Sequence, residues 1–153
     1  MAEKKFKVEQ LDHVHVYVAD QYEAAVWYKE VLGLDILAEH ESWAREGGPL
    51  TISSDGGNTC LALFQRAREA GAAVSTIAFR VRGESFIAFL AGLEEREVLD
   101  EHGRRVTGGD VVDHDHSFSL YFCDPYGNPY ELTTYEYRYV SERIGCIPKN
   151  TAR

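Results

Sequence analysis

The same order of predicted elements occurs twice along the chain, and this repeat restricts the possible folds more than any other feature. In each half, alternating apolar residues predict a strand, residues at helical spacing predict one helix, and three more strands follow. The first half spans about residues 9–66 and the second about residues 73–136. One helix can cover only one face of a four-stranded sheet. We therefore predict an α+β protein with two tandem βαβββ modules, whose curved mixed sheets form a shared cleft.

Turn and cap residues set the predicted boundaries of these elements. Asp20 is placed to cap the first helix and Gly33 to end it. The run 124–128 predicts a tight turn before the last strand, because Pro fixes φ while Gly and Asn accept positive φ. Residues 137–153 form a C-terminal tail outside the single domain at 9–136. The second helix is predicted at 84–95, and the strands at 11–19, 34–41, 48–54, 58–65, 75–81, 97–106, 117–123 and 129–136.

Charge and composition exclude several classes of partner. The net charge of -9 argues against nucleic acid, whose phosphates require a basic face. No stretch approaches the roughly 18 apolar residues of a membrane span, and the N-terminus lacks the apolar segment of a secretory signal. The cysteines lie far apart without a CxxC pair, which indicates a reducing compartment. We expect a cytoplasmic protein whose partner is a small-molecule substrate or ligand.

Two strands far apart in sequence carry candidate metal ligands. Side chains alternate along a strand, so His13 and His15 share one face of the first strand. Glu131 lies within the last strand, where a carboxylate is costly to bury unless it is paired or binds a metal. Imidazole and carboxylate are common ligands of Fe(II), Mn, Zn and Ni. His13 and Glu131 are therefore candidate metal ligands, and a hydrogen-bonded pair without metal is the alternative.

Other polar residues share the faces of these two groups. His15 is a candidate third ligand, a catalytic base or a group that contacts substrate. Tyr121 is a candidate catalytic hydrogen-bond donor to an oxyanion, or an ordinary aromatic strand residue. His114 and His116 belong to a hydrogen-bonded network that supports the site, to a proton shuttle, or to a solvated loop. The polar residues predicted to bind substrate are Tyr17, Thr76, Arg80, Ser119 and Thr133.

The opening and closing motifs resemble those of the vicinal oxygen chelate superfamily, which includes glyoxalase I, bleomycin-resistance proteins, fosfomycin-resistance enzymes and extradiol dioxygenases. The resemblance spans about residues 9–136. It implies a metal held by the first and last strands of each module. The motifs are Leu11-Asp12-His13-Val14, Trp27-Tyr28-Lys29-Glu30-Val31-Leu32-Gly33-Leu34 and Leu120-Tyr121-Phe122-Cys123-Asp124-Pro125-Tyr126-Gly127-Asn128-Pro129-Tyr130-Glu131-Leu132.

Carried onto this chain, the ligand positions of the family are His13, Leu61, Thr76 and Glu131. Leu61 cannot bind a metal, and Thr76 stands where metal-dependent relatives carry His. Either His15 or water then supplies the missing ligand, or the cleft binds no metal.

Three functions are compatible with this resemblance. The first is a divalent-metal enzyme, dioxygenase-like or a lyase or isomerase, acting on a small oxygen-rich substrate. The run Ser117-x-Ser119-x-Tyr121-Phe122 resembles the dioxygenase branch, where such a Tyr hydrogen-bonds the substrate oxygen. The second is a metal-free protein of the bleomycin-resistance type that sequesters an aromatic or cationic compound. The third is an interaction module with a degenerate cleft. Single-domain members usually pair, so the resemblance also implies a homodimer.

Overall fold

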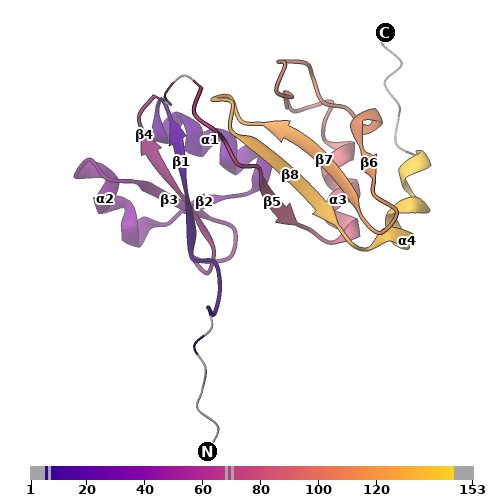
Figure 1. The fold of residues 1–153 in the computed structure, drawn as a ribbon, viewed down its shortest axis with the longest axis horizontal. Helices are drawn as coiled ribbons and strands as arrows, with labels where there is room; N and C mark the ends of the chain where they lie inside the picture. Colours follow the sequence, from indigo (N-terminus) through magenta and orange to yellow (C-terminus); the bar gives the residue numbers. More distant parts are fainter. Residues whose placement is uncertain (1–5, 7, 68, 70, 147–153) are drawn as a thin grey trace, which may run out of the picture. The chain divides into compact units, whose positions relative to one another are not determined.

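The computed structural model describes residues 6, 8–67, 69 and 71–146, and the chain divides into two compact units, residues 1–69 and 70–153. Each unit holds a four-stranded mixed sheet in the βαβββ order. Figure 1 shows α1 and α3 each lying against one face of their own unit's sheet. The predicted α+β fold with two βαβββ modules is confirmed, and the shared cleft stays a prediction.

The sheet of the first unit pairs its first strand with its last. Its order is β1 (His13–Val18), β4 (Cys60–Gln65), β3 (Leu50–Ser53) and β2 (Asp35–Ile36). β1 runs parallel to β4, and the other pairs are antiparallel. The core side of this sheet carries Val16, Val18 and Leu63, which are buried together with Tyr28 of α1 (Gln21–Leu32).

Both ends of α1 follow the predicted caps. The side chain of Asp20 accepts hydrogen bonds from the backbone N–H groups of Tyr22 and Glu23, each at 2.9 Å. These are two of the donors that a helix start leaves without an internal partner. Gly33 ends the helix with φ +68°, a left-handed conformation that favours glycine.

The strand predicted at 34–41 is wrong over most of its length. Only β2 (Asp35–Ile36) forms, and it is followed by the 3-10 helix η1 (Ala38–His40) and by α2 (Glu41–Arg45). The segment after β2 contains no β-branched residue and several good helix formers. Local helix propensity therefore prevails where the apolar alternation is weak.

The second unit repeats the arrangement of the first. Its sheet has the order β5 (Ile77–Arg80), β8 (Pro129–Thr134), β7 (Phe118–Cys123) and β6 (Val112–Asp113), with β5 parallel to β8. Phe86 and Leu90 of α3 (Gly83–Ala91) are buried. α4 (Tyr137–Ser141) packs against α3, and η3 (Ile144–Cys146) follows. A Cβ at Gly83 would lie 2.7 Å from the ring of Tyr139, so this contact requires glycine.

The strand predicted at 97–106 is also wrong. Leu99 makes single bridges to Arg105 and Cys123, but a tight turn replaces a continuous strand. The side chain of Asp100 accepts hydrogen bonds from the backbone N–H groups of His102 and Arg104, each at 2.9 Å. An Asp side chain that binds the backbone in this way competes with strand pairing.

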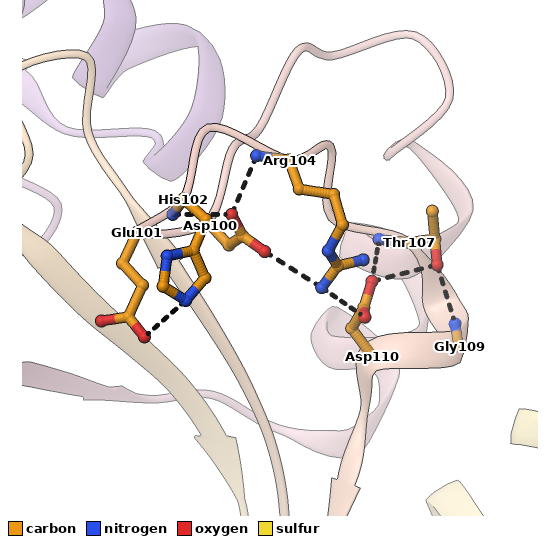
Figure 2. A network of polar contacts seen from close by, with 7 residues as sticks. All are labelled: Asp100, Glu101, His102, Arg104, Thr107, Gly109 and Asp110. Carbon is orange, nitrogen blue, oxygen red and sulfur yellow. Dashed lines mark hydrogen bonds and ion pairs between the residues drawn. The ribbon is translucent and has the colours of Figure 1, made fainter.

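Arg104 links this turn to the 3-10 helix that follows it. The Arg104 guanidinium lies 3.0 Å from Asp100 and 2.9 Å from Asp110 of η2 (Gly108–Asp110), as Figure 2 shows. Burial alone would raise the pKa of Asp110, but hydrogen bonds from Arg104 and Thr107 outweigh it and hold that pKa below its ordinary value. This network fixes the connection between α3 and β6.

Two further sequence expectations can be compared with the described residues. Cys60 and Cys123 are both buried, in separate units of the chain, which agrees with their wide spacing in the sequence. Within the described part of the chain, no helix is both long enough and apolar enough to cross a bilayer.

Candidate functional site

Two imidazoles on β1 face each other at close range. The Nε2 atoms of His13 and His15 lie 3.2 Å apart, and their rings stack with centroids 5.2 Å apart. The Nδ1 atom of His13 lies 2.6 Å from Oδ2 of Asp12. Alternation along β1 puts both rings on the face opposite the buried Val16 and Val18. Both histidines are exposed, so a ligand can reach their ring nitrogens.

The donor set of this pair suits a divalent metal ion. Two nitrogens that bind one ion at about 2.0–2.1 Å lie roughly 3 Å apart when they occupy neighbouring positions. Asp12 favours the tautomer of His13 that carries a proton on Nδ1 and leaves the lone pair of Nε2 free. Among the residues that the structure describes, no group of three or more His, Cys, Asp or Glu is arranged to hold a metal. A complete ligand set therefore stays a prediction.

The strand register corrects one position that the family resemblance implies. Leu61 pairs with Val14, so it lies on the core side of the sheet and is 3% exposed. The β4 residues on the imidazole face are Cys60, opposite His13, and Ala62, opposite His15. Burial, with Asp12 and Asp55 nearby, raises the pKa of the Cys60 thiol, which therefore stays protonated at neutral pH. β4 thus contributes one protonated thiol to this face, and neither an imidazole nor a carboxylate.

Glu131 is held in a defined orientation in the second unit. The hydroxyl of Ser119, which is fully buried, donates a hydrogen bond to Oε1 of Glu131 at 2.7 Å. The same hydroxyl lies 3.1 Å from that of Thr133. Because β7 and β8 pair directly at Tyr121 and Glu131, the phenol and the carboxylate share one face. The carboxylate is half-buried: the buried Ser119 hydroxyl orients it, and its exposed part is accessible to a ligand.

Tyr121 belongs to a short polar network with Glu131 and His114. Its hydroxyl lies 3.2 Å from Nε2 of His114, and the phenol is 41% exposed. Burial and the neighbouring Glu131 carboxylate raise the pKa of Tyr121 above its ordinary value. The phenol therefore keeps its proton at neutral pH and can donate a hydrogen bond. Of the three interpretations for His114, this contact favours the network.

The residues predicted to bind substrate differ in exposure. Ser119 and Thr133 are buried, and their hydroxyls support Glu131. Thr76 is exposed just before β5, and the exposed Arg80 lies over the ring of Tyr135 at 4.9 Å. Contact of these residues with a substrate stays a prediction.

Three residues beside the predicted site were missed in the sequence. Asp12 is adjacent to His13 in the sequence, but strand alternation predicts that their side chains lie on opposite faces, so a contact between them was not expected. Phe64 and Arg66 become relevant only once β4 is paired with β1, because the register then puts Phe64 beside Tyr17. The guanidinium of Arg66 lies 4.2 Å from the centroid of the Tyr17 ring. Arg66 lies just beyond the strand predicted at 58–65.

The chain thus consists of two βαβββ units, and each sheet carries polar side chains on the face opposite its core. The model of the Glyoxalase/Bleomycin resistance protein/Dioxygenase superfamily matches residues 10–132. The chain belongs to this superfamily, as its opening and closing motifs predicted. No curated protein matches the chain.

Solved structures with the same fold include proteins with different stated roles. Oxidase ChaP-H2 is 22% identical with a TM-score of 0.61, over 84% of this chain and 94% of its own. TnmS3, an antibiotic binding protein from Streptomyces sp. CB03234, is 23% identical with a TM-score of 0.61, over 86% and 100%. A glyoxalase/dioxygenase from Nostoc punctiforme is 19% identical with a TM-score of 0.60, over 82% and 90%. At these identities the likeness establishes the fold alone.

Proposed function

We propose that this protein binds one divalent metal ion and catalyses a reaction on a small oxygen-rich molecule. The observation that carries the proposal is the pair of Nε2 atoms of His13 and His15, 3.2 Å apart and supported by Asp12 at 2.6 Å. Glu131 is the further protein ligand that we propose, because it occupies the family position on the last strand and Ser119 orients it. The candidate ions are Fe, Mn, Zn and Ni, which accept imidazole and carboxylate together.

Three residues have distinct roles in this proposal beside the metal ion. A bound divalent ion supplies Lewis-acid polarisation of a substrate oxygen or, as iron, activation of oxygen. Tyr121 keeps its proton and donates a hydrogen bond to a substrate oxygen on which negative charge develops. Ser119 orients Glu131 through its hydrogen bond to Oε1. His15 binds the ion or, when it is not a ligand, accepts a proton from substrate.

The reaction class rests on family membership and on the polar groups described above. The stated roles of ChaP-H2 as an oxidase and of the Nostoc punctiforme protein as a glyoxalase/dioxygenase support an enzyme. We propose that Tyr17, Thr76 and Arg80 contact the substrate. Thr76 takes the place of the usual His, so fewer protein ligands remain than in metal-dependent relatives.

Metal binding can be tested directly on the purified chain. Protein prepared without chelator is analysed for metals, and Zn²⁺ is then titrated into the metal-free protein by calorimetry. We expect one ion per chain with micromolar affinity or better, and at least tenfold weaker binding in His13→Ala and Glu131→Gln. His102→Ala is the matched control, because His102 is an exposed histidine paired with Glu101 in a surface turn.

The double variant tests whether the two residues bind the same ion. If they do, His13→Ala and Glu131→Gln together reduce affinity by much less than the product of the single effects. Zn²⁺ binding that is weaker than micromolar in the wild-type chain, or that neither substitution changes, would contradict the proposal.

A metal-free binding protein is the second candidate function. It is favoured by the absence of any imidazole or carboxylate on β4 and by the stated role of TnmS3 as an antibiotic binding protein. A thermal-shift screen of small aromatic compounds in the presence of EDTA distinguishes the two functions. A compound that raises the unfolding temperature without metal supports binding, and hits that require metal support the enzyme.

We also propose a homodimer, because single-domain members of the family usually pair. Sedimentation that shows only a 17.3 kDa monomer would remove this part of the proposal.

A further inference from the structure

A row of rings runs along the imidazole face of the first unit. We call it the ring row, and it consists of His13, His15, Phe64 and Tyr17. The centroids of His15 and Phe64 lie 4.6 Å apart and those of Phe64 and Tyr17 lie 6.2 Å apart, beyond the stacked histidine pair. The two histidines are exposed, and Tyr17 and Phe64 are half-buried. Solvent-facing ring surface of this kind favours stacking with another flat π-system.

A guanidinium ends the ring row at the side away from His13. Arg66 lies over Tyr17, with Cζ 4.2 Å from the ring centroid, and its side chain is exposed. Within the described residues no carboxylate forms an ion pair with Arg66, although the chain carries a net charge of -9. Other arginines of this acidic protein do have such partners, as Arg45 does with Glu41 at 3.4 Å. An unpaired guanidinium at the end of a stacking surface suits an anionic group.

We propose that the ring row binds a planar aromatic molecule and that Arg66 binds an acidic substituent at one end of it. This inference rests on the proposed function, because it names the substrate class for the face that carries His13 and His15. The aromatic plane lies along Phe64 and Tyr17, and the end away from Arg66 reaches the histidine pair. A sulfonate or carboxylate on the ring system is selected over a neutral or cationic group.

The length of the row sets the size of the ligand. His13 and Tyr17 are four residues apart on one strand, which corresponds to about 13 Å at roughly 3.3 Å per residue. A single benzene ring covers only a part of this distance. Two or three fused rings with an acidic substituent can contact Phe64 and Tyr17 and still reach toward His15.

A matched pair of probes tests the acidic group without the metal. Naphthalene-2-sulfonate and 2-naphthol share the same fused rings, but only the first is anionic at pH 7. Binding of each is measured by calorimetry in EDTA with wild-type protein, Arg66→Gln, and the control Arg45→Gln. We expect submillimolar binding of the sulfonate, a loss of about tenfold in Arg66→Gln, and 2-naphthol binding that changes by less than about twofold. The control should leave both affinities unchanged.

A second substitution tests the stacking surface. Phe64→Leu keeps an apolar side chain but removes the ring, and we expect about threefold or greater weakening for both probes. Trp43→Leu is its control, because this exposed ring stacks on His40, outside the ring row. Thermal unfolding of each variant verifies that it is folded, and Arg66→Gln keeps the test valid even if Phe64→Leu is not.

The outcomes separate this inference from metal binding. Sulfonate binding in EDTA that depends on Arg66 supports the inference whether or not the chain binds Zn²⁺. The inference is overturned if the sulfonate binds with a dissociation constant above about 1 mM, the range of weak ligands. It is also overturned if Arg66→Gln weakens both probes equally. Neither result affects the metal test.

Discussion

The contact between Asp12 and His13 allows a quantitative test of the proposed metal site. Replacing Asp12 with Asn removes the negative charge beside Nδ1 of His13 but keeps an oxygen that accepts its proton, whereas Asp12→Ala removes both. Outer partners of metal-binding histidines usually contribute about 10–100-fold in affinity. The Asp12 side chain is 80% exposed, so water screens its charge, and we expect a loss at or just below the bottom of that range despite the short 2.6 Å contact. The expected loss is about fivefold to tenfold for Asp12→Asn and larger for Asp12→Ala.

Competition with a chromophoric chelator measures these affinities for Zn²⁺, and the absorption of bound Co²⁺ reports the ligand geometry. Asp35→Asn provides the control, because it makes the same change in charge in the same unit at a carboxylate that pairs with Lys29. If Asp12→Asn and Asp12→Ala bind Zn²⁺ as tightly as Asp35→Asn does, Asp12 does not orient a metal ligand and the reasoning is refuted.

Three further predictions concern stability and ionisation. Gln21→Leu should lower the free energy of unfolding by about 3 kcal/mol, measured by urea titration, because the buried amide donates to two backbone carbonyls at 2.7 and 2.8 Å. Asp110→Asn should lower the thermal midpoint at pH 7 by a few degrees. Because the pKa of Asp110 is lowered, its stabilisation is present above the unfolded pKa and is lost as acid titrates it, so the wild-type and variant midpoints should converge below about pH 4. The pKa of Tyr121, read at 295 nm as the difference between wild type and Tyr121→Phe, should lie above its ordinary value and fall in Glu131→Gln, and an unchanged value would exclude coupling of these two groups.

The sequence predicts those elements whose local chemistry and apolar pattern agree. Asp20 and Gly33 predict the ends of α1, because Asp is a favoured N-cap residue and Gly readily adopts the left-handed conformation that ends a helix. β7 and β8 follow from apolar runs on both sides of a strong turn. The strand predictions at 34–41 and 97–106 were wrong. Helix propensity competes with strand pairing in the first segment, and the Asp100 turn competes with it in the second.

The candidate site was predictable residue by residue but not as a set of contacts. Alternation along β1 identifies His13 and His15, and an acidic residue in a strand identifies Glu131. The register of β1 against β4 is not written in either strand alone, so Leu61 was assigned to the wrong face and Phe64 was missed. Register depends on tertiary pairing, and a shift by one residue exchanges the two faces.

The parallel pairing of β1 with β4 has a consequence for synthesis of the chain. β1 ends at Val18, whereas its partner β4 ends at Gln65, so the ribosome adds 47 residues between the two events. At roughly 5–20 residues per second this interval lasts about 2 to 9 seconds, during which the edge of β1 has no neighbour. A nascent polypeptide with an open strand edge is a target for chaperones and for association with other chains. During this interval one face of β1 is hydrophilic, because it carries the imidazoles of His13 and His15.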